Sequence, residues 1–242
     1  MRVPVEAVIF DWGGTLSHWA LVEFHEVWRM AARHLAPHLA ETEDELAARL
    51  AQVELDAWSQ MDRDNRAFTF RQLVDRASAA IGVDVADAIV DEASDHYLES
   101  WVPHIEHFPE VAPVLAELQR RGIRTGLLSN THWPADFHER MLERDGLAHL
   151  LDARVYTSDL EFAKPHPSAF EAALSSVGVS DPTRAVYVGD RLFDDVFGAQ
   201  RVGMRAVHRP NAHVPSYDIE PDGRVSDLNE LLTLVDRWQQ ES

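Results

Sequence analysis

The sequence contains no cysteine, which excludes disulfides, thiolate metal sites and a thiol nucleophile. It contains one lysine, Lys164, while its other fixed cations are arginines. A compositional bias toward arginine would explain this scarcity, but the presence of a single lysine also favours a functional role for it. No run of about 18 apolar residues is present, so no membrane-spanning helix is expected. Residues 1–10 are too short for a signal peptide, and a cytoplasmic protein is predicted.

Positive charge is also scarce. The chain of 242 residues has 41 acidic and 22 basic residues, a net charge of -19. Such a surface repels nucleic acid and anionic membranes, so neither is expected as a partner. An anionic substrate would need a local positive pocket. The hydrophobic share of 45% suits one large domain or one domain with an insert. A monomer or a homodimer is expected.

Two hydrophobic patterns divide the chain. Residues 5–10 form an apolar, β-branched run that predicts a strand. From about residue 19 to residue 101, apolar residues recur at helical spacing, which predicts about four helices and no strand. After residue 109, strands and helices alternate. The expected strands cover 123–128, 153–157, 185–188 and 205–208, and the expected helices cover 111–118, 134–144, 167–177, 194–202 and 228–238.

Strands that alternate with helices imply an α/β fold, here a Rossmann-like parallel sheet with helices on both faces. An all-helical cap of four helices is inserted after the first strand. We therefore expect a catalytic core over residues 1–17 and 103–242, and a cap domain over residues 18–102. Residues 209–223, with three prolines, are predicted to form a surface loop.

Polar side chains follow several of the predicted strands. The first strand leads into Asp11, the strand over 123–128 leads into Ser129 and Asn130, and the strand over 185–188 leads into Asp190. Lys164 precedes the helix over 167–177. Because the carboxyl ends of parallel strands meet at one edge of a sheet, we expect these groups to lie together.

This set of groups suits phosphoryl transfer. Carboxylate and carbonyl oxygens are the ligands that Mg²⁺ prefers. A phosphate dianion can approach Asp11 only if its charge is offset, and the metal and Lys164 would do that. Ser129 and backbone N–H groups would hold the phosphoryl oxygens. Asp11 would then attack phosphorus, and water would hydrolyse the resulting aspartyl-phosphate.

Four short motifs resemble those of the haloacid dehalogenase superfamily, in the branch with a helical cap after the first strand. In chain order they are Phe10-Asp11-Trp12-Gly13-Gly14-Thr15-Leu16, Leu128-Ser129-Asn130, Lys164-Pro165-His166-Pro167, and Val188-Gly189-Asp190 with Asp194-Asp195. The resemblance spans nearly the whole chain and implies a hydrolase. It implies that Asp11 is the nucleophile and that Ser129 and Lys164 hold the phosphoryl group. The implied Mg²⁺ ligands are Asp11, the Gly13 carbonyl and Asp190, supported by Asp194 or Asp195.

Four further residues are predicted to contact the substrate: Thr15, His18, Asn130 and His132. His18 and His132 could also replace a missing acid or base, since histidine titrates near neutral pH. The simpler interpretation is that both histidines are ordinary polar residues near a cleft.

Gly13 departs from the pattern of the family's phosphatases. There, an Asp two residues after the nucleophile protonates the leaving oxygen and then activates water, and glycine can do neither. General acid–base catalysis is worth about 10²–10⁴-fold in rate. The backbone carbonyl of Gly13 remains available to a metal. The sequence therefore predicts an intact phosphate site with weakened proton transfer.

Four interpretations follow. The first is a phosphatase whose leaving group needs little protonation, such as an acyl phosphate, or whose proton comes from a histidine or the substrate. A phosphonatase-like enzyme would need a lysine in the cap, but Lys164 belongs to the core. A 2-haloacid dehalogenase works without metal, and its relatives lack the Gly189-Asp190 pair. The last is a catalytically quiet phosphate-binding scaffold. We predict a Mg²⁺-dependent phosphatase of a small phosphorylated metabolite.

Overall fold

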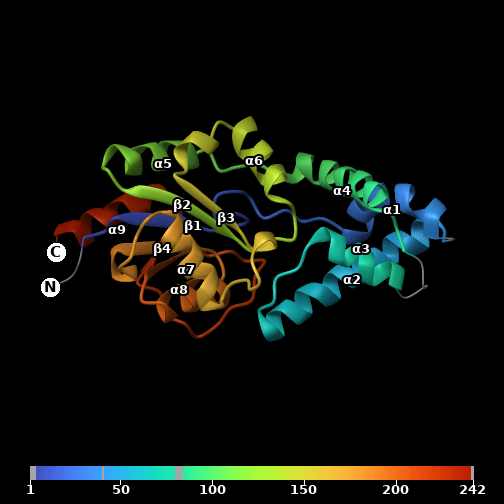
Figure 1. Cartoon of the computed structure of the whole chain (residues 1–242). Helices are drawn as coiled ribbons and strands as arrows, with labels where there is room; N and C mark the ends of the chain where they lie inside the picture. Colours follow the sequence, from blue (N-terminus) through green and yellow to red (C-terminus); the bar gives the residue numbers. More distant parts are fainter. Residues whose placement is uncertain (1–3, 40, 80–83, 241–242) are drawn as a thin grey trace.

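The computed structural model describes residues 4–39, 41–79 and 84–240. Within these residues, six strands form one parallel sheet in the order β3-β2-β1-β4-β5-β6. The strands are β1 (Ala7–Phe10), β2 (Arg124–Ser129), β3 (Ala153–Tyr156), β4 (Ala185–Gly189), β5 (Arg205–His208) and β6 (Gly223–Arg224). The order reverses at β1, so the chain places its first strand in the middle of the sheet (Figure 1).

Helices cover both faces of this sheet. Side chains of β1 alternate, so Val8 and Phe10 pack in one hydrophobic cluster while Ala7 and Ile9 pack in another. The first cluster includes α5 (Val111–Arg120), α6 (Ala135–Arg144) and α9 (Asn229–Gln240). The second includes α7 (Pro167–Ser176), a π-helical turn (Leu192–Phe197) and α8 (Gly198–Arg201). The predicted α/β class with a Rossmann-like sheet is confirmed.

Short 3₁₀ turns join these elements at Val102–His104, Ala148–Leu150, Thr157–Asp159 and Pro182–Arg184. No helix of the described residues is long and apolar enough to cross a membrane.

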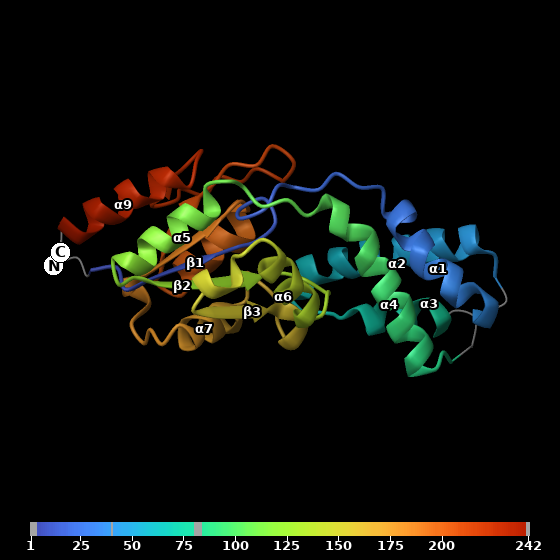
Figure 2. The same ribbon diagram turned by 90° about the horizontal axis from the view of Figure 1, so that it is seen from above.

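The described residues between β1 and α5 form four α-helices, the number that the sequence predicts. They are α1 (Phe24–Leu39), α2 (Glu43–Asp64), α3 (Phe70–Ala79) and α4 (Asp87–Trp101). Their shared interior includes Leu35, Leu50 and Leu73, which are fully buried. The two views in Figures 1 and 2 place this helical insert beyond the carboxyl ends of the strands, at the opposite end of the molecule from the termini.

The insert is connected to the sheet through two paired linkers. The outgoing chain donates from the His18 N–H to the Glu106 carbonyl at 2.9 Å. The returning chain donates from the Phe108 N–H to the Leu16 carbonyl at 3.0 Å. The insert also contacts the core through the segment between α2 and α3. There the Asn65 carbonyl accepts a hydrogen bond from the Ala163 N–H at 2.8 Å. The insert is thus held at the linkers and also beside the residue that precedes Lys164.

The prediction of a surface loop over residues 209–223 is wrong at both of its ends. Arg209 is buried, with its guanidinium 3.8 Å from the centre of the Phe108 ring. This guanidinium also donates to the Thr15 carbonyl and to Glu110, each at 3.0 Å. At the other end, Gly223 pairs with Val207 as the start of β6. Burial of Arg209 is tolerated because its N–H donors have hydrogen-bond partners. Those partners lie far away in the sequence, so no local pattern predicts them.

Candidate active site

The sheet register brings the predicted strand ends together. Phe10 on β1 pairs with Leu127 on β2 and with Val188 on β4. Asp11 therefore lies one residue beyond this row, while Ser129 and Asp190 lie two residues beyond it on the flanking strands. All three are buried at the edge of the sheet that faces the insert. The predicted meeting of these side chains follows directly from the parallel register.

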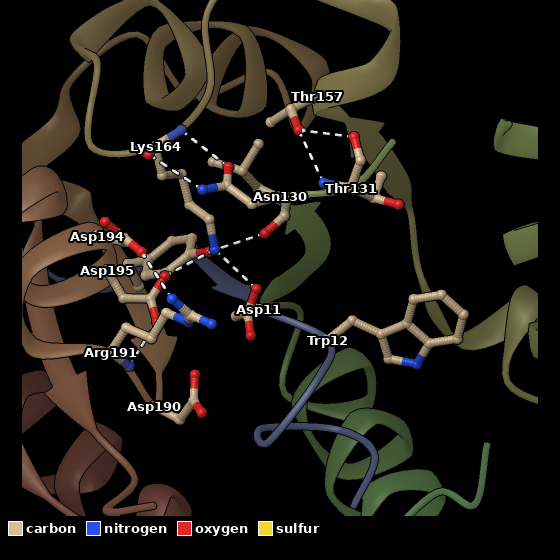
Figure 3. A network of polar contacts seen from close by, with 12 residues as sticks. Asp11, Trp12, Asn130, Thr131, Thr157, Lys164, Asp190, Arg191, Asp194 and Asp195 are labelled. Atoms are coloured by element: carbon tan, nitrogen blue, oxygen red, sulfur yellow. Dashed lines mark hydrogen bonds and ion pairs between the residues drawn. The ribbon is translucent and has the colours of Figure 1, made fainter. Parts of the chain in front are cut away.

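Lys164 lies at the centre of the polar network in Figure 3, with 2% of its surface exposed. Its Nζ donates to Asp11 Oδ1 at 2.7 Å, to Asp195 Oδ1 at 2.7 Å and to the Tyr187 hydroxyl at 2.8 Å. These contacts satisfy the three donors of the ammonium. Burial alone would lower the pKa of Lys164, but Asp11 and Asp195 raise it well above its usual value. The chain's only lysine is therefore a fixed positive charge beside Asp11.

Asn130 fixes the backbone of Lys164. Its Oδ1 accepts from the Lys164 N–H at 2.9 Å, and its Nδ2 donates to the Lys164 carbonyl at 3.0 Å. The sequence predicted that Asn130 contacts the substrate. The structure places both ends of its amide on the Lys164 backbone, so Asn130 is suited to orient the lysine. Its contact with a substrate stays a prediction.

Three carboxylates meet beside this lysine. Asp11, Asp190 and Asp195 each offer an oxygen, and these atoms lie within 4.8 Å of one another. Burial, and then the charges of Asp11 and Asp195, raise the pKa of Asp190 to about 8. Burial also raises the pKa of Asp11, although Lys164 opposes the shift. A divalent cation would relieve this repulsion between buried carboxylates.

The donor set fits Mg²⁺. Asp190 Oδ1 is buried and has no hydrogen-bond partner among the described residues, so it is free to ligate a cation. Oxygen ligands are what Mg²⁺ prefers, and it binds through a few carboxylates while it keeps several waters. The residues present are therefore consistent with the magnesium site that the sequence predicts.

Two glycines make room for the carboxylates. Gly14 has a φ of +83°, and a Cβ atom there would overlap Asp190 Oδ2. A Cβ atom on Gly189 would overlap the carboxylate of Asp195. Gly14 therefore lets Asp190 approach the turn after β1, and Gly189 lets Asp195 approach the end of β4.

The structure separates Asp195 from Asp194, which the sequence could not do. Asp195 joins the carboxylate cluster, and its Oδ2 accepts from the Arg191 N–H at 2.8 Å. Asp194 instead lies 3.4 Å from the guanidinium of Arg191. Burial raises the pKa of Asp194 to about 6, although Arg191 opposes the shift. Of the two acids, Asp195 is the one that lies beside Asp11 and Asp190.

Thr15, Ser129 and Gly13 surround the same turn. Thr15 is fully buried, and its Oγ1 has no hydrogen-bond partner among the residues described. Ser129 is buried at the end of β2. Gly13 is partly exposed, and apart from its chain neighbours no described residue has an atom within 4 Å of the place where a Cβ would stand on it. The site thus has open space at the position where the resemblance implies an acid.

Neither histidine proposed as a stand-in acid has a described contact with Asp11. His18 is exposed, and its ring centre lies 3.9 Å from that of Phe108 at the linker. His132 is 3% exposed and lies against the insert, with its Nε2 3.3 Å from the Tyr97 hydroxyl and 3.8 Å from Glu54 Oε1. Burial lowers the pKa of His132, although Glu54 opposes the shift. The simpler interpretation, that both are ordinary polar residues, agrees with these positions.

Three residues in or next to the site were missed by sequence reasoning. The Tyr187 hydroxyl accepts from Lys164 and donates to the Leu128 carbonyl at 2.8 Å. Asn211 donates to Asp190 Oδ2 at 2.6 Å, and Arg209 holds the Thr15 carbonyl. Tyr187 was detectable as the one polar side chain in an aliphatic strand. Asn211 and Arg209 gave no such signal, because they lie in a segment rich in proline.

Comparisons of the sequence with known proteins agree on one protein family. A family model described as haloacid dehalogenase-like hydrolase matches residues 5–203. A phosphoserine phosphatase of Thermus thermophilus is 30% identical over 229 residues, which cover 93% of this chain and 78% of the relative. A glyceraldehyde 3-phosphate phosphatase of Methanopyrus kandleri is 29% identical over 238 residues, which cover 93% of this chain and 97% of the relative.

Two solved structures have the same overall fold. A 2-haloacid dehalogenase from Pseudomonas syringae is 27% identical with a TM-score of 0.69, and the match covers 97% of this chain and 99% of that one. A phosphatase from Thermococcus onnurineus is 24% identical with a TM-score of 0.65, and the match covers 96% and 98% of the two chains. The second of these likenesses concerns the fold alone.

Proposed function

The chain belongs to the haloacid dehalogenase-like hydrolases, and from this premise we propose that it is a Mg²⁺-dependent phosphatase of a small phosphorylated metabolite. The observation that carries the proposal is the ammonium of Lys164, which contacts Asp11 and Asp195 within a buried group of carboxylates. A carboxylate nucleophile can meet a phosphate only where fixed positive charge offsets the repulsion. The phosphatase names of the Thermus and Methanopyrus relatives support the same activity.

Asp11 is the proposed nucleophile. One of its carboxylate oxygens would form a bond to phosphorus while the bond from phosphorus to the leaving oxygen breaks, and the electron pair would depart with that oxygen. Water would then hydrolyse the aspartyl-phosphate, which releases phosphate and restores the carboxylate. Lys164, oriented by Asn130, and Ser129 at the end of β2 would bind the phosphoryl oxygens.

Asp11, Asp190 and Asp195 are the proposed Mg²⁺ ligands, together with the Gly13 carbonyl. When bound, Mg²⁺ would supply positive charge to the phosphoryl oxygens. The unpartnered Asp190 Oδ1 and the raised pKa of that side chain support this assignment. Asn211 would keep Asp190 oriented through its hydrogen bond to the other oxygen. Asp194, paired with Arg191, would act at a distance from the metal.

The absence of an acidic side chain at Gly13 limits the kinds of phosphorylated substrate that we propose. With no acid at this position, a leaving group that is stable as an anion is favoured, as in acyl phosphates and aryl phosphates. A simple alkyl phosphate needs its leaving oxygen protonated, and this step is worth about 10²–10⁴-fold in rate. We therefore expect turnover to depend steeply on the acidity of the leaving group.

The helical insert is proposed to act as a cap domain over residues 18–102, with a core over residues 1–17 and 103–242. The paired linkers at His18 and Phe108 support these boundaries. The position of the insert beyond the strand ends supports a role in covering the site (Figure 2). Contacts between the segment after α2 and the residue before Lys164 would couple the cap to the phosphate site.

A second candidate is a 2-haloacid dehalogenase. It is favoured by the likeness to the Pseudomonas syringae dehalogenase and by Gly13, because a halide leaves without a proton. In that reaction, Asp11 would displace halide from carbon, and water would hydrolyse the ester. The buried Asp190 argues for the phosphatase, since a reaction without metal gives this carboxylate nothing to ligate.

The test is a phosphate-release screen of acyl, aryl and alkyl phosphates, run with Mg²⁺ and with a chelator, beside a halide-release assay on 2-haloacids. The phosphatase proposal expects Mg²⁺-dependent phosphate release that Asp11→Asn abolishes. Halide release that survives chelation would replace it with the dehalogenase. Phosphate binding by calorimetry without any turnover would leave a phosphate-binding scaffold.

A further inference from the structure

A second group of possible metal ligands lies on the helical insert, far in the sequence from the carboxylate cluster. His34 on α1 faces Glu92 and His96 on α4, and the three offer ligand atoms within 4.8 Å of one another. The His34 and His96 rings are stacked, with centres 3.7 Å apart and an angle of 6° between their planes. The Nδ1 atom of His34 lies 3.6 Å from Glu92 Oε1.

The two helices fix the positions from which these side chains project. Glu92 and His96 are four residues apart on α4, so they lie on one face of that helix. On α1, His34 is next to Leu35, and on α4, His96 is next to Tyr97; both neighbours are buried in the shared hydrophobic cluster. Packing under the three ligands therefore fixes the backbone positions from which they project.

The ligand types select a different metal from the one proposed beside Asp11. Neutral imidazole nitrogens and one carboxylate suit Zn²⁺ and neighbouring first-row ions, whereas Mg²⁺ prefers oxygen alone. The stacked rings present their nitrogens in parallel planes, so one ring has to turn about its side-chain bonds before both nitrogens can face a common ion. Neutral imidazole is the form that binds metals. Ligands of a tetrahedral Zn²⁺ lie about 3.3 Å apart, given Zn–N distances of about 2.0–2.1 Å.

The side chains can close to that spacing. The His34 side chain is 29% exposed and that of Glu92 is 63% exposed, so both have room to turn toward a common ion. A water would complete the coordination, as it does at zinc sites with three protein ligands. We propose that His34, Glu92 and His96 form a site for a zinc-like divalent ion that cross-links α1 to α4.

Such a cross-link would stabilise the part of the insert that carries both linkers. The outgoing linker leads into α1, and the returning linker follows α4 (Figure 1). An ion that binds the folded state alone raises the unfolding temperature in proportion to the logarithm of its concentration over its Kd. Zn²⁺ should therefore raise the unfolding temperature of the protein without any need for a substrate.

The experiment is calorimetric titration of the full chain with Zn²⁺ in excess Mg²⁺, so that the oxygen site beside Asp11 is already occupied. We expect one Zn²⁺ site and a higher unfolding temperature. His96→Gln should weaken binding by about tenfold or more and remove the thermal effect. His149→Gln is the matched control, because His149 is an exposed histidine outside the cluster, and it should change neither readout.

Glu92→Gln provides a second variant, since its exposed side chain can be changed without disturbing the interior of the insert. It should also weaken Zn²⁺ binding. Equal affinity in the parent protein and both variants would overturn the proposal, as would an absence of binding to the parent protein. Neither outcome bears on the phosphatase proposal, because the measurement does not depend on turnover.

Discussion

The side-chain amide of Asn130 forms two hydrogen bonds with the backbone of Lys164, one to its N–H at 2.9 Å and one to its carbonyl at 3.0 Å. The two residues are 34 positions apart in the sequence. Asn130 directly follows β2, while Lys164 contacts Asp11, which directly follows β1. The pair thus ties the third sequence motif to the second and sets where the positive charge lies.

Asn130→Ala should weaken both stability and turnover. Each lost hydrogen bond is worth about 1 kcal/mol, so we expect the free energy of unfolding to fall by about 1–3 kcal/mol. A displaced Lys164 would lower kcat more than it changes KM. Urea unfolding and steady-state kinetics measure the two effects. Gln52→Ala, which removes an exposed amide from α2, is the control, and an unchanged kcat in Asn130→Ala would contradict the positioning role.

Asp194→Asn and Asp195→Asn form a matched pair of variants. Asp195 contacts Lys164 and lies within the carboxylate cluster, whereas Asp194 pairs with Arg191. We expect Asp195→Asn to weaken Mg²⁺ binding and turnover by about 10–100-fold. Asp194→Asn should have a much smaller effect on both. Calorimetric Mg²⁺ titration of each variant measures this difference, and equal losses would mean that the geometry of the cluster misassigns the ligand.

Mg²⁺ binding should depend on pH through Asp190. Its pKa is raised to about 8, first by burial and then by Asp11 and Asp195. Below that pH the folded protein holds a proton that Mg²⁺ must displace. The affinity should therefore rise about tenfold per pH unit between about pH 6 and about pH 8 and then level off. Titration calorimetry in buffers of different ionisation enthalpy should show a proton released for each Mg²⁺ bound at neutral pH.

The raised pKa of Asp190 also makes the stability of the metal-free protein depend on pH. Unfolded Asp190 loses its proton near its ordinary pKa of 3.8, whereas the folded, metal-free protein keeps it up to about pH 8. Between these values the folded state binds more protons than the unfolded state. This side chain therefore makes the free energy of unfolding fall as the pH rises. Asp190→Asn should flatten that dependence, and so should saturating Mg²⁺.

Much of the fold and part of the site could be predicted from the sequence. The alternating strands and helices and the four helices of the insert follow from local hydrophobic periodicity. The meeting of Asp11, Ser129 and Asp190 follows from parallel register, because strand ends share one edge of the sheet. These features depend on short stretches of chain whose pattern is visible without tertiary contacts.

The remaining features depend on contacts between distant residues. The hydrogen bonds between the Asn130 amide and the Lys164 backbone could not be predicted, because sequence order cannot show that the two residues meet. His132 looked like a candidate acid because its neighbours lie at a strand end, but the loop turns its ring toward Glu54 and Tyr97 of the insert. The buried guanidinium of Arg209 has hydrogen-bond partners that lie 99 and 194 residues away. No local pattern encodes such pairs.

The insert has a buried carboxylate whose loss should be costly. Glu54 is 1% exposed and accepts hydrogen bonds from Trp28 at 2.6 Å, Tyr97 at 3.0 Å and Trp58 at 3.2 Å. Glu54→Gln would replace one acceptor oxygen with a donor and leave a buried N–H facing it. We expect the free energy of unfolding to fall by about 2–4 kcal/mol. Glu99→Gln, an exposed change on α4, should cost less than about 1 kcal/mol in the same urea titration.

Gly13→Asp should restore the proton transfer that the chain lacks. Apart from its chain neighbours, no described residue has an atom within 4 Å of the Cβ position at Gly13, so a Cβ can be added there without displacing a neighbour. A carboxylic acid there could protonate the leaving oxygen and then activate water. Turnover of alkyl phosphates should rise by up to about 10²-fold, the lower end of the range for general acid–base catalysis. Aryl phosphates should gain little, because their leaving groups are already stable as anions.

The control for this gain is Gly13→Asn, which adds a side chain of the same size that cannot donate and recover a proton at neutral pH. If the acid is what limits the parent protein, kcat/KM for alkyl phosphates rises with aspartate and not with asparagine, and its dependence on the pKa of the leaving group becomes shallower. Equal rates in all three proteins would mean that another group, or the substrate, already supplies the proton. A gain with both variants would point to a change in the shape of the pocket, because only the aspartate carries the titratable group.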